Sequence, residues 1–324
     1  MPHLLRRKSD WLLLAYQTSV YALLAALFVA FSRGPLWVKV VSYPVAALLT
    51  QKYESCLHYA VHAPVFRKKF MNAVHRLSWF VLPLPVVLYR REHFHHHRYN
   101  NLAHDQTTTL DESGTRHVSV LTYVRRNIAS TRDFYSLLSH SERSEAALHL
   151  ALCLTLLIAL CVAAPVAGLL FWLPVSWIGA PAMNALFCYF GHVPGDPYDK
   201  YRASTYVPVE HWWQRALCWL DFHNSAYHLT HHLFPSVHWS ELHKLQKQME
   251  PEYEQHHSPR SLAFNSMILL NPFALVATIW RVNKARDATT LSPPSSDDKS
   301  GVRGSRERVT TDAWAKSAGQ SFAP

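Results

Sequence analysis

Three short runs of histidine are the residues of this chain that could do chemistry. They read His58-x3-His62, His93-x2-His96-His97 and His228-x2-His231-His232. Residues three or four positions apart share one face of a helix, so each run can direct two or three imidazoles at one point, whereas His95 falls off that face. Eight imidazoles exceed the four ligands of a tetrahedral zinc ion, and imidazole suits iron, copper, zinc and nickel. The spacing therefore predicts a site for two metal ions.

Three further residues have positions that suit this site. His192 follows the last apolar segment directly, so we expect it to leave the membrane close to His62 and to act as a ninth ligand. Glu54 lies one helical turn before His58, where it can accept a hydrogen bond from a ligand N–H. Asn184 lies two turns before His192 and can reach the site through water. The predicted metal ligands are His58, His62, His93, His96, His97, His192, His228, His231 and His232, with no further catalytic side chain.

Long apolar segments must position these histidines. Residues 11–32 contain no Asp, Glu, Lys or Arg, and neither do residues 146–190, which are long enough for two membrane spans around a turn at 163–165. A further apolar segment, 36–52, leads into the first histidine run. We therefore predict an all-α integral membrane protein with about four transmembrane helices and a helical cap that carries the histidines. The spans are 11–32, 36–52, 146–163 and 166–190.

The C-terminal part of the chain has a different composition. Residues 262–280 are moderately apolar, and we expect them to lie against the membrane surface or the protein. From there on the sequence is rich in Ser, Pro and charge, which is typical of a disordered segment. The predicted organisation is a membrane domain over residues 1–281 and a disordered polar tail over residues 282–324.

The charge distribution predicts how the protein is oriented. Lys and Arg number 32 against 22 Asp and Glu, a formal net charge of +10. The basic residues carry no nucleic-acid-binding motif; with four spans, most of them, both termini and every histidine run fall on one side. Positive charge marks the cytoplasmic side. We expect a multi-pass protein of a bacterial inner membrane with a cytoplasmic metal site and no nucleic-acid partner.

The five cysteines give no sign of a metal cluster or a disulfide framework. They are Cys56, Cys153, Cys161, Cys188 and Cys218, they form no C-x-x-C pair, and most lie in apolar runs. We interpret them as small buried hydrophobic residues.

The second and third histidine runs resemble motifs of the membrane fatty acid desaturase superfamily. Residues 90–97 read Arg-Arg-Glu-His-Phe-His-His-His, which fits that family's R-x-x-H-x-x-H-H box. Residues 227–239 read Tyr-His-Leu-Thr-His-His-Leu-Phe-Pro-Ser-Val-His-Trp, similar to the Y-H-x-x-H-H-x-F-P-x-x-P-W stretch of acyl desaturases. His238 stands where many members have proline. In the region before His192, some members have Asn-x-x-x-His, whereas this chain has Asn184-x-x-x-Cys188 and then His192. The resemblance covers roughly residues 45–245.

This resemblance implies a centre of two iron ions on the cytoplasmic cap. Such enzymes use O2 and two electrons to attack an unactivated C–H bond of a lipid acyl chain. The sequence has neither a heme-type His-Pro-Gly-Gly nor a cysteine cluster, so the resemblance implies a separate electron donor of the ferredoxin or cytochrome b5 type.

The ligand set leaves several reactions open. We favour fatty acyl desaturation because the third run is most similar to acyl desaturases. Hydroxylation or ketolation of a lipid or terpenoid and oxidative decarboxylation of a fatty acid use the same ligands. Outside enzymes, a metal-binding membrane protein is the alternative. A transporter is disfavoured because transporters place polar ligands within their spans, and the spans here are free of them.

Overall fold

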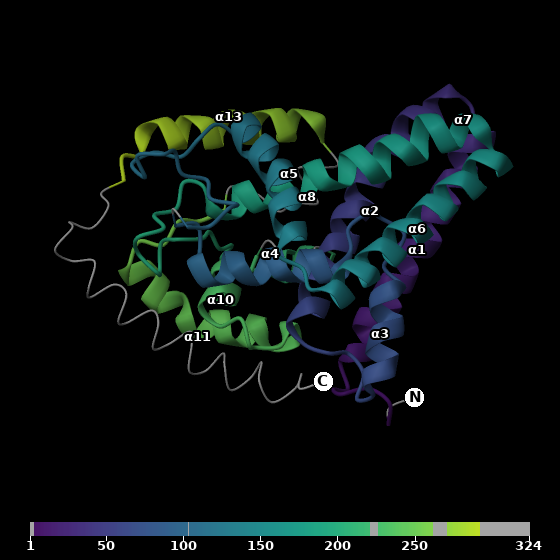
Figure 1. Ribbon diagram of the computed structural model, residues 1–324. Coiled ribbons are helices and arrows are strands. Elements are labelled where there is room, and N and C mark those ends of the chain that lie inside the picture. Colours follow the sequence, from purple (N-terminus) through teal and green to yellow (C-terminus); the bar gives the residue numbers. More distant parts are fainter. Residues whose placement is uncertain (1–2, 103, 221–225, 262–270, 292–324) are drawn as a thin grey trace.

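Helices make up nearly all of the regular structure. A computed structural model describes residues 3–102, 104–220, 226–261 and 271–291. Within these ranges the chain forms helices and three isolated β-bridges but no strand. Figure 1 shows long helices that extend to one end of the molecule, where α7 (Pro165–Ala167) lies. A group of shorter helices around α4 (Val86–Tyr99), α10 (His228–Leu233) and α11 (Leu242–Gln255) lies at the other end. The predicted all-helical fold is confirmed for this part of the chain.

Three of the described helical segments are long and apolar enough to cross a membrane. They are α1 (Asp10–Arg33), α6 (His140–Ala163) and the continuous segment Pro165–His192. They agree with the predicted spans 11–32, 146–163 and 166–190. The turn between the last two consists of Ala164, as expected from the proline that follows it.

The segment Pro165–His192 changes its helical geometry along its length. It comprises α7 (Pro165–Ala167), the π-helical turns η1 (Gly168–Trp172) and η2 (Pro174–Gly179), and α8 (Ala180–His192). Pro174 has no backbone N–H and its ring would clash in a regular α-helix. A local π-helical turn absorbs such an interruption, so the segment reaches His192 without a break.

Helix α2 (Leu36–His62) differs from these three segments. It is helical throughout the predicted span 36–52, but it is not one of the helices that are long and apolar enough to cross a membrane. Its second half explains why: Gln51, Lys52 and Glu54 are polar and nevertheless buried in the protein. The helix therefore has an apolar first half and a polar, buried second half that brings the first histidine run into the cap.

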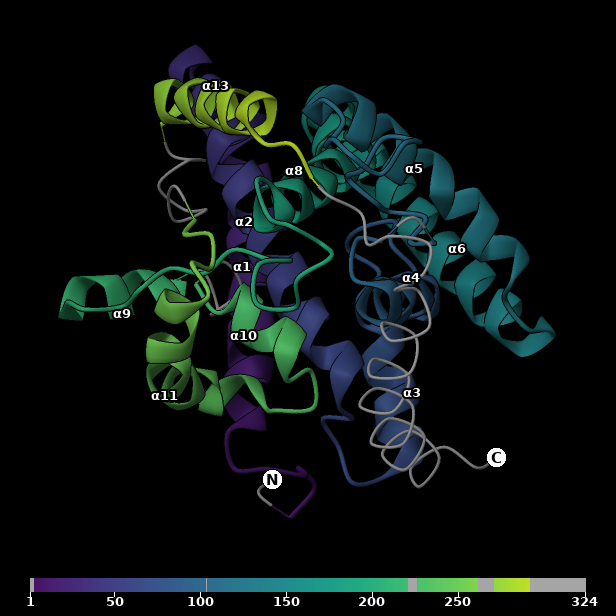
Figure 2. The same cartoon turned by 90° about the vertical axis from the view of Figure 1, so that its left-hand side faces the viewer.

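The cap consists of shorter helices around the end of α2 (Figures 1 and 2). Helix α4 ends at Tyr99, and the following residue, Asn100, adopts a left-handed backbone conformation with φ 42°. Ion pairs of Arg76 with Glu145 and of Arg91 with Glu142 join the cap to the start of α6. The cap helices are α3 (Lys69–Leu77), α4 (Val86–Tyr99), α5 (Val120–Ser136), α9 (Trp212–Leu220), α10 (His228–Leu233), η3 (Trp239–Glu241) and α11 (Leu242–Gln255). Helix α13 (Pro272–Ala288) lies apart from the end of α2, beside α8 and the first half of α2 (Figure 2).

Two contacts bear on the C-terminal half of the chain. Leu275 and Ile279 of α13 pack on a cluster that includes residues of α5 and α8, so this helix lies against the protein. It continues to Ala288, so residues 282–288 of the predicted disordered tail are helical. Residues 262–270 and 292–324 lie outside the described residues.

His238, in the position of the family's proline, has its Nε2 atom 2.9 Å from Oδ1 of Asp10 and so links the start of α1 to the segment after α10.

Candidate metal centre

The structure brings all nine predicted ligands together in two adjoining groups. The first group comprises His58, His62, His93, His97 and His231, whose ligand atoms all lie within 4.8 Å of one another. The second is centred on His192, which groups with His96 on one side and with His228 and His232 on the other. The predicted clustering is therefore present in the fold, while metal binding by these residues stays a prediction.

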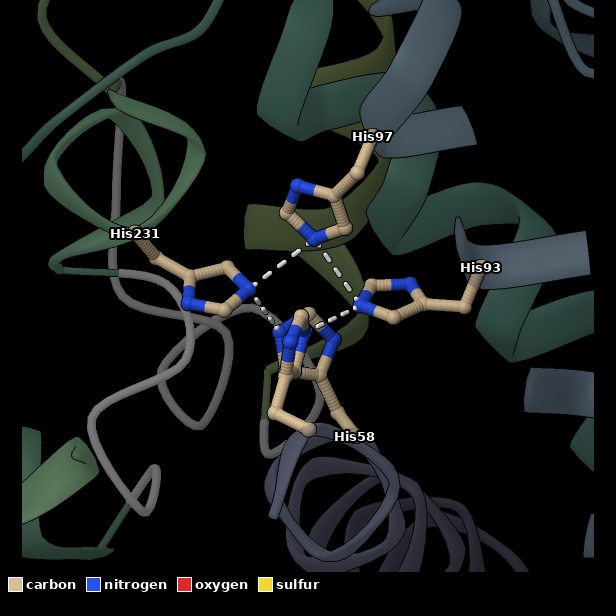
Figure 3. A group of neighbouring side chains, drawn as sticks. His58, His93, His97 and His231 are labelled. Atoms are coloured by element: carbon tan, nitrogen blue, oxygen red, sulfur yellow. Dashed lines mark hydrogen bonds between the residues drawn. The ribbon is translucent and has the colours of Figure 1, made fainter. Parts of the chain in front are cut away.

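In the first group the Nε2 atoms face one another. The Nε2 atom of His231 lies 2.8 Å from that of His58 and 3.1 Å from that of His97. The Nε2 atom of His93 lies 2.9 Å from that of His97 and 2.7 Å from that of His62. Figure 3 shows four of these rings pointing their Nε2 atoms at one central point. Five imidazoles from three helices thus converge.

In the second group, too, Nε2 atoms of the histidines face one another. The Nε2 atom of His192 lies 2.9 Å from that of His96 and 3.2 Å from that of His228. The ring of His232 approaches those of His228 and His192, with centroids 4.5 and 4.9 Å away. Both nitrogens of His232 are buried and have no hydrogen-bond partner among the described residues.

These separations fit imidazoles around a metal ion. A metal–imidazole bond is about 2.0–2.1 Å long, so two such ligands at right angles have nitrogens about 3 Å apart. The Nε2 separations of 2.7–3.2 Å in both groups agree with that value. Two neutral rings can share only one hydrogen bond, and rings that all face one point cannot all be satisfied in that way. The donor set fits two metal ions.

The protonation of the rings also fits ligation. Burial lowers the pKa of His93, His97 and His231 well below its ordinary value, and the neighbouring rings lower it further. These imidazoles are therefore neutral at physiological pH. Only the neutral ring offers a lone pair to a metal ion.

Two ligand rings have hydrogen bonds that orient them. Nδ1 of His96 lies 2.6 Å from Oδ2 of Asp105, and Nδ1 of His192 donates to the carbonyl of Ala203 at 2.9 Å. Such a partner fixes the tautomer so that Nε2 faces the metal. Burial disfavours the charge on Asp105, but the close imidazole of His96 and the hydrogen bonds from His96 and Thr107 outweigh it and hold the pKa of Asp105 below its ordinary value.

The two groups use the helices in a crossed manner. From α4, His93 and His97 go to the first group and His96 to the second. From α10, His228 and His232 go to the second group, whereas His231 goes to the first. The H-x-x-H-H spacing allows this division, because residues i+3 and i+4 flank residue i on opposite sides and, being consecutive, diverge by about 100° around the helix axis.

The two predicted supporting residues line a cavity beside the histidines. Glu54 and Asn184 border this cavity of about 80 Å³ together with His58, His96 and His228. Glu54 is only 6% exposed, and its Oε1 atom has no hydrogen-bond partner among the described residues. Within that part of the chain no hydrogen bond joins Glu54 to a ligand ring, so the expected bond to a ligand N–H is absent from this structure.

Sequence reasoning missed several polar residues of the site. Glu92 also lines the cavity, and burial together with the charge of Asp105 raises its pKa to about 8. Asn127 donates a long hydrogen bond of 3.5 Å to Glu92. Glu92 lies within the second histidine run, one residue before His93, and that position is the one signal that could have indicated it. Asp105 lies shortly after the second histidine run, a position from which an acidic residue can orient a ligand, but acidic residues in polar loops are usually solvated. The carbonyl of Ala203 leaves no signal in the sequence.

The remaining buried histidines have other partners. His75 contacts Gln17, His117 contacts the carbonyl of Gly195, and His149 contacts the carbonyl of Leu82. His95 turns away from the site, as predicted, and its ring lies against Phe134.

Fold and site together define a class of protein, a helical protein with segments able to span a membrane and two histidine groups that could each hold a metal ion. Residues 35–264 match the fatty acid desaturase family, so the chain belongs to that family, as the motifs indicated. Membership implies an oxidoreductase of lipids. No curated protein and no solved structure matches the chain.

Proposed function

We propose that this protein is a membrane fatty acyl desaturase that binds two iron ions through the nine histidines and uses O2. The observation that carries the proposal is the convergence of nine imidazoles from α2, α4, α8 and α10 in two adjoining groups. Carboxylate-rich di-iron sites use Glu and Glu-x-x-His instead. The ligand set here agrees with the desaturase family.

The proposed membrane arrangement has four spans. The first half of α2 exposes Leu36, Trp37 and Val40 by 61–77%, which suits contact with lipid. With this half as the fourth span, both termini and the histidine groups lie on the side that carries the positive charge, the cytoplasmic side. The separate electron donor, a ferredoxin or a cytochrome b5, then docks on the cap, and the acyl chain enters from the bilayer.

The residues of the site provide ligation, orientation and a dry environment. When bound, the two iron ions supply the activation of O2 that an inert C–H bond requires. Asp105 and the carbonyl of Ala203 hold two of the imidazoles in place. Phe187 and Phe190 form an apolar part of the cavity wall that suits an aliphatic chain. Glu92, with its raised pKa, keeps a proton on its carboxyl at the edge of the same cavity.

Mass spectrometry of fatty acids and lipids from cells with and without the gene tests the reaction. A product lighter by two hydrogens supports desaturation, whereas a product heavier by one oxygen contradicts it in favour of hydroxylation.

The matched pair His96→Ala and His95→Ala tests the site, because His96 faces the second group and His95 lies against Phe134. We expect loss of product and of bound iron in His96→Ala only; full activity in that variant refutes the ligand assignment.

A further inference from the structure

We propose that Cys188 is the fifth donor of the second group and binds its metal ion as a thiolate. The inference rests on the proposed binuclear centre and adds to it a sulfur ligand in a site otherwise made of imidazole. Cys188 Sγ lies within 4.8 Å of the ligand nitrogens of both His96 and His192. It also lines the cavity beside the histidines.

The arrangement of the two groups indicates a missing donor at this position. The first group takes His58 and His62, at i and i+4, from the end of α2, which finishes at His62. The second group takes His192 from the end of α8, which finishes at His192. The residue four positions before His192 is Cys188.

Helices α4 and α10 also supply the two groups in matching numbers. Helix α4 gives an i, i+4 pair to the first group and a single histidine to the second, and α10 does the reverse. Each group is then built from a pair at the C-terminal end of α2 or α8, a pair from one of the helices α4 and α10, and a single residue from the other. With Cys188 included, both groups have five donors.

The surroundings of Cys188 suit a ligated sulfur. The hydroxyl of the buried Tyr123 donates a hydrogen bond to Sγ at 3.1 Å, the kind of contact that orients and stabilises a metal-bound thiolate. A second, independent observation is Glu54, which lines the same cavity, is only 6% exposed and has an unpartnered Oε1 atom. A buried polar atom without a partner points to a ligand in the cavity.

Bond lengths and charge are consistent with the assignment. Metal–thiolate and metal–imidazole bonds of about 2.3 and 2.1 Å place a sulfur and a nitrogen on opposite sides of one ion about 4.4 Å apart. The Sγ atom of Cys188 and the ligand nitrogens of His96 and His192 lie within 4.8 Å of one another, which agrees with such an arrangement. Ligation replaces the S–H bond by a sulfur–metal bond, the proton leaves to solvent, and no electron is transferred.

Cobalt substitution tests the inference without reference to activity. The full-length protein, purified in detergent and freed of metal, is titrated with Co²⁺. A thiolate bound to cobalt gives a strong near-ultraviolet charge-transfer absorption, which imidazole ligands lack. We expect this absorption in the wild type, its loss in Cys188→Ser and its retention in the matched control Cys153→Ser, because Cys153 bonds to the carbonyls of Phe80 and Leu82 instead.

Each outcome decides the matter. Two bound cobalt ions without the absorption, or an absorption that persists in Cys188→Ser, overturns the role of Cys188 and leaves the proposed function intact. Failure to bind cobalt at all overturns both. Should Cys188→Ser not fold, a variant in which the four other cysteines are serine must keep the absorption, since Cys188 is then its one possible source.

Discussion

Gly191 gives the most direct test of the second group, because it has no side chain where His228 approaches α8. A Cβ atom at this position would lie 2.6 Å from Nε2 of His228, whereas ordinary van der Waals contact begins at 3.4 Å. In Gly191→Ala the ring must therefore retreat by about 0.8 Å, the difference between these distances. Metal–ligand distances tolerate only about ±0.2 Å, so His228 can no longer bind the ion.

We expect Gly191→Ala to retain the first metal ion and to lose the second. Removal of a hydrogen bond behind a ligand weakens metal binding roughly 10–100-fold, and displacement of the ligand itself should weaken it at least as much. Metal content per chain, measured by mass spectrometry of the purified protein, should fall from two towards one. Gly179→Ala is the matched control, since its Cβ would meet only the carbonyl of Pro174 at 3.3 Å. Two ions bound with unchanged affinity in Gly191→Ala would refute the placement of His228.

Three further predictions concern partners of the site and of the cap. Asp105→Asn removes the charged acceptor behind His96 and should weaken metal binding roughly 10–100-fold in a chelator competition, with an unchanged affinity arguing that this hydrogen bond is dispensable. Burial, helped by the interaction with the neighbouring ring of His96, lowers the pKa of His58 to about 3. Below the ordinary pKa of about 6.5, the unfolded chain therefore binds a proton that the folded chain does not. The metal-free protein should therefore lose about 2 kcal/mol of stability through this residue between pH 7.5 and 5, and denaturation curves that coincide at the two pH values would contradict this. His238→Ala leaves the buried carboxylate of Asp10 without its imidazole partner and should cost about 1–3 kcal/mol, visible as a lower melting temperature in detergent, whereas an unaltered melting temperature would show that the contact is unimportant.

The elements that position the site could largely be predicted, because their signals are local. The histidine spacing follows from helical periodicity, and the turn at Ala164 follows from Pro165 between two apolar runs. The second half of α2 is less predictable, because the burial of Lys52 and Glu54 depends on the cap helices that surround them rather than on the sequence of α2.

The part of the site that could not be predicted consists of contacts between distant segments. Asp105 reaches His96, and the carbonyl of Ala203 reaches His192, only because loops fold back over the helix ends. A backbone carbonyl leaves no trace in residue type. Cys188 has a local signal, its spacing from His192, but a thiol in an apolar run is normally a buried hydrophobic residue, and the correspondence with His58 becomes visible only when the two groups are seen together.

The crossed use of α4 and α10 has a consequence for how the centre is loaded with metal. Each of these helices supplies histidines to both groups, so in the proposed centre the first ion to bind would restrain both helices and thereby order histidines of the other group before the second ion arrives. The second ion then meets a smaller entropic penalty, which is positive cooperativity. At limiting metal, the population should divide into empty and fully loaded molecules, with few that carry a single ion. Under the proposed function, such loading would avoid exposing one lone redox-active iron ion to O2 during assembly.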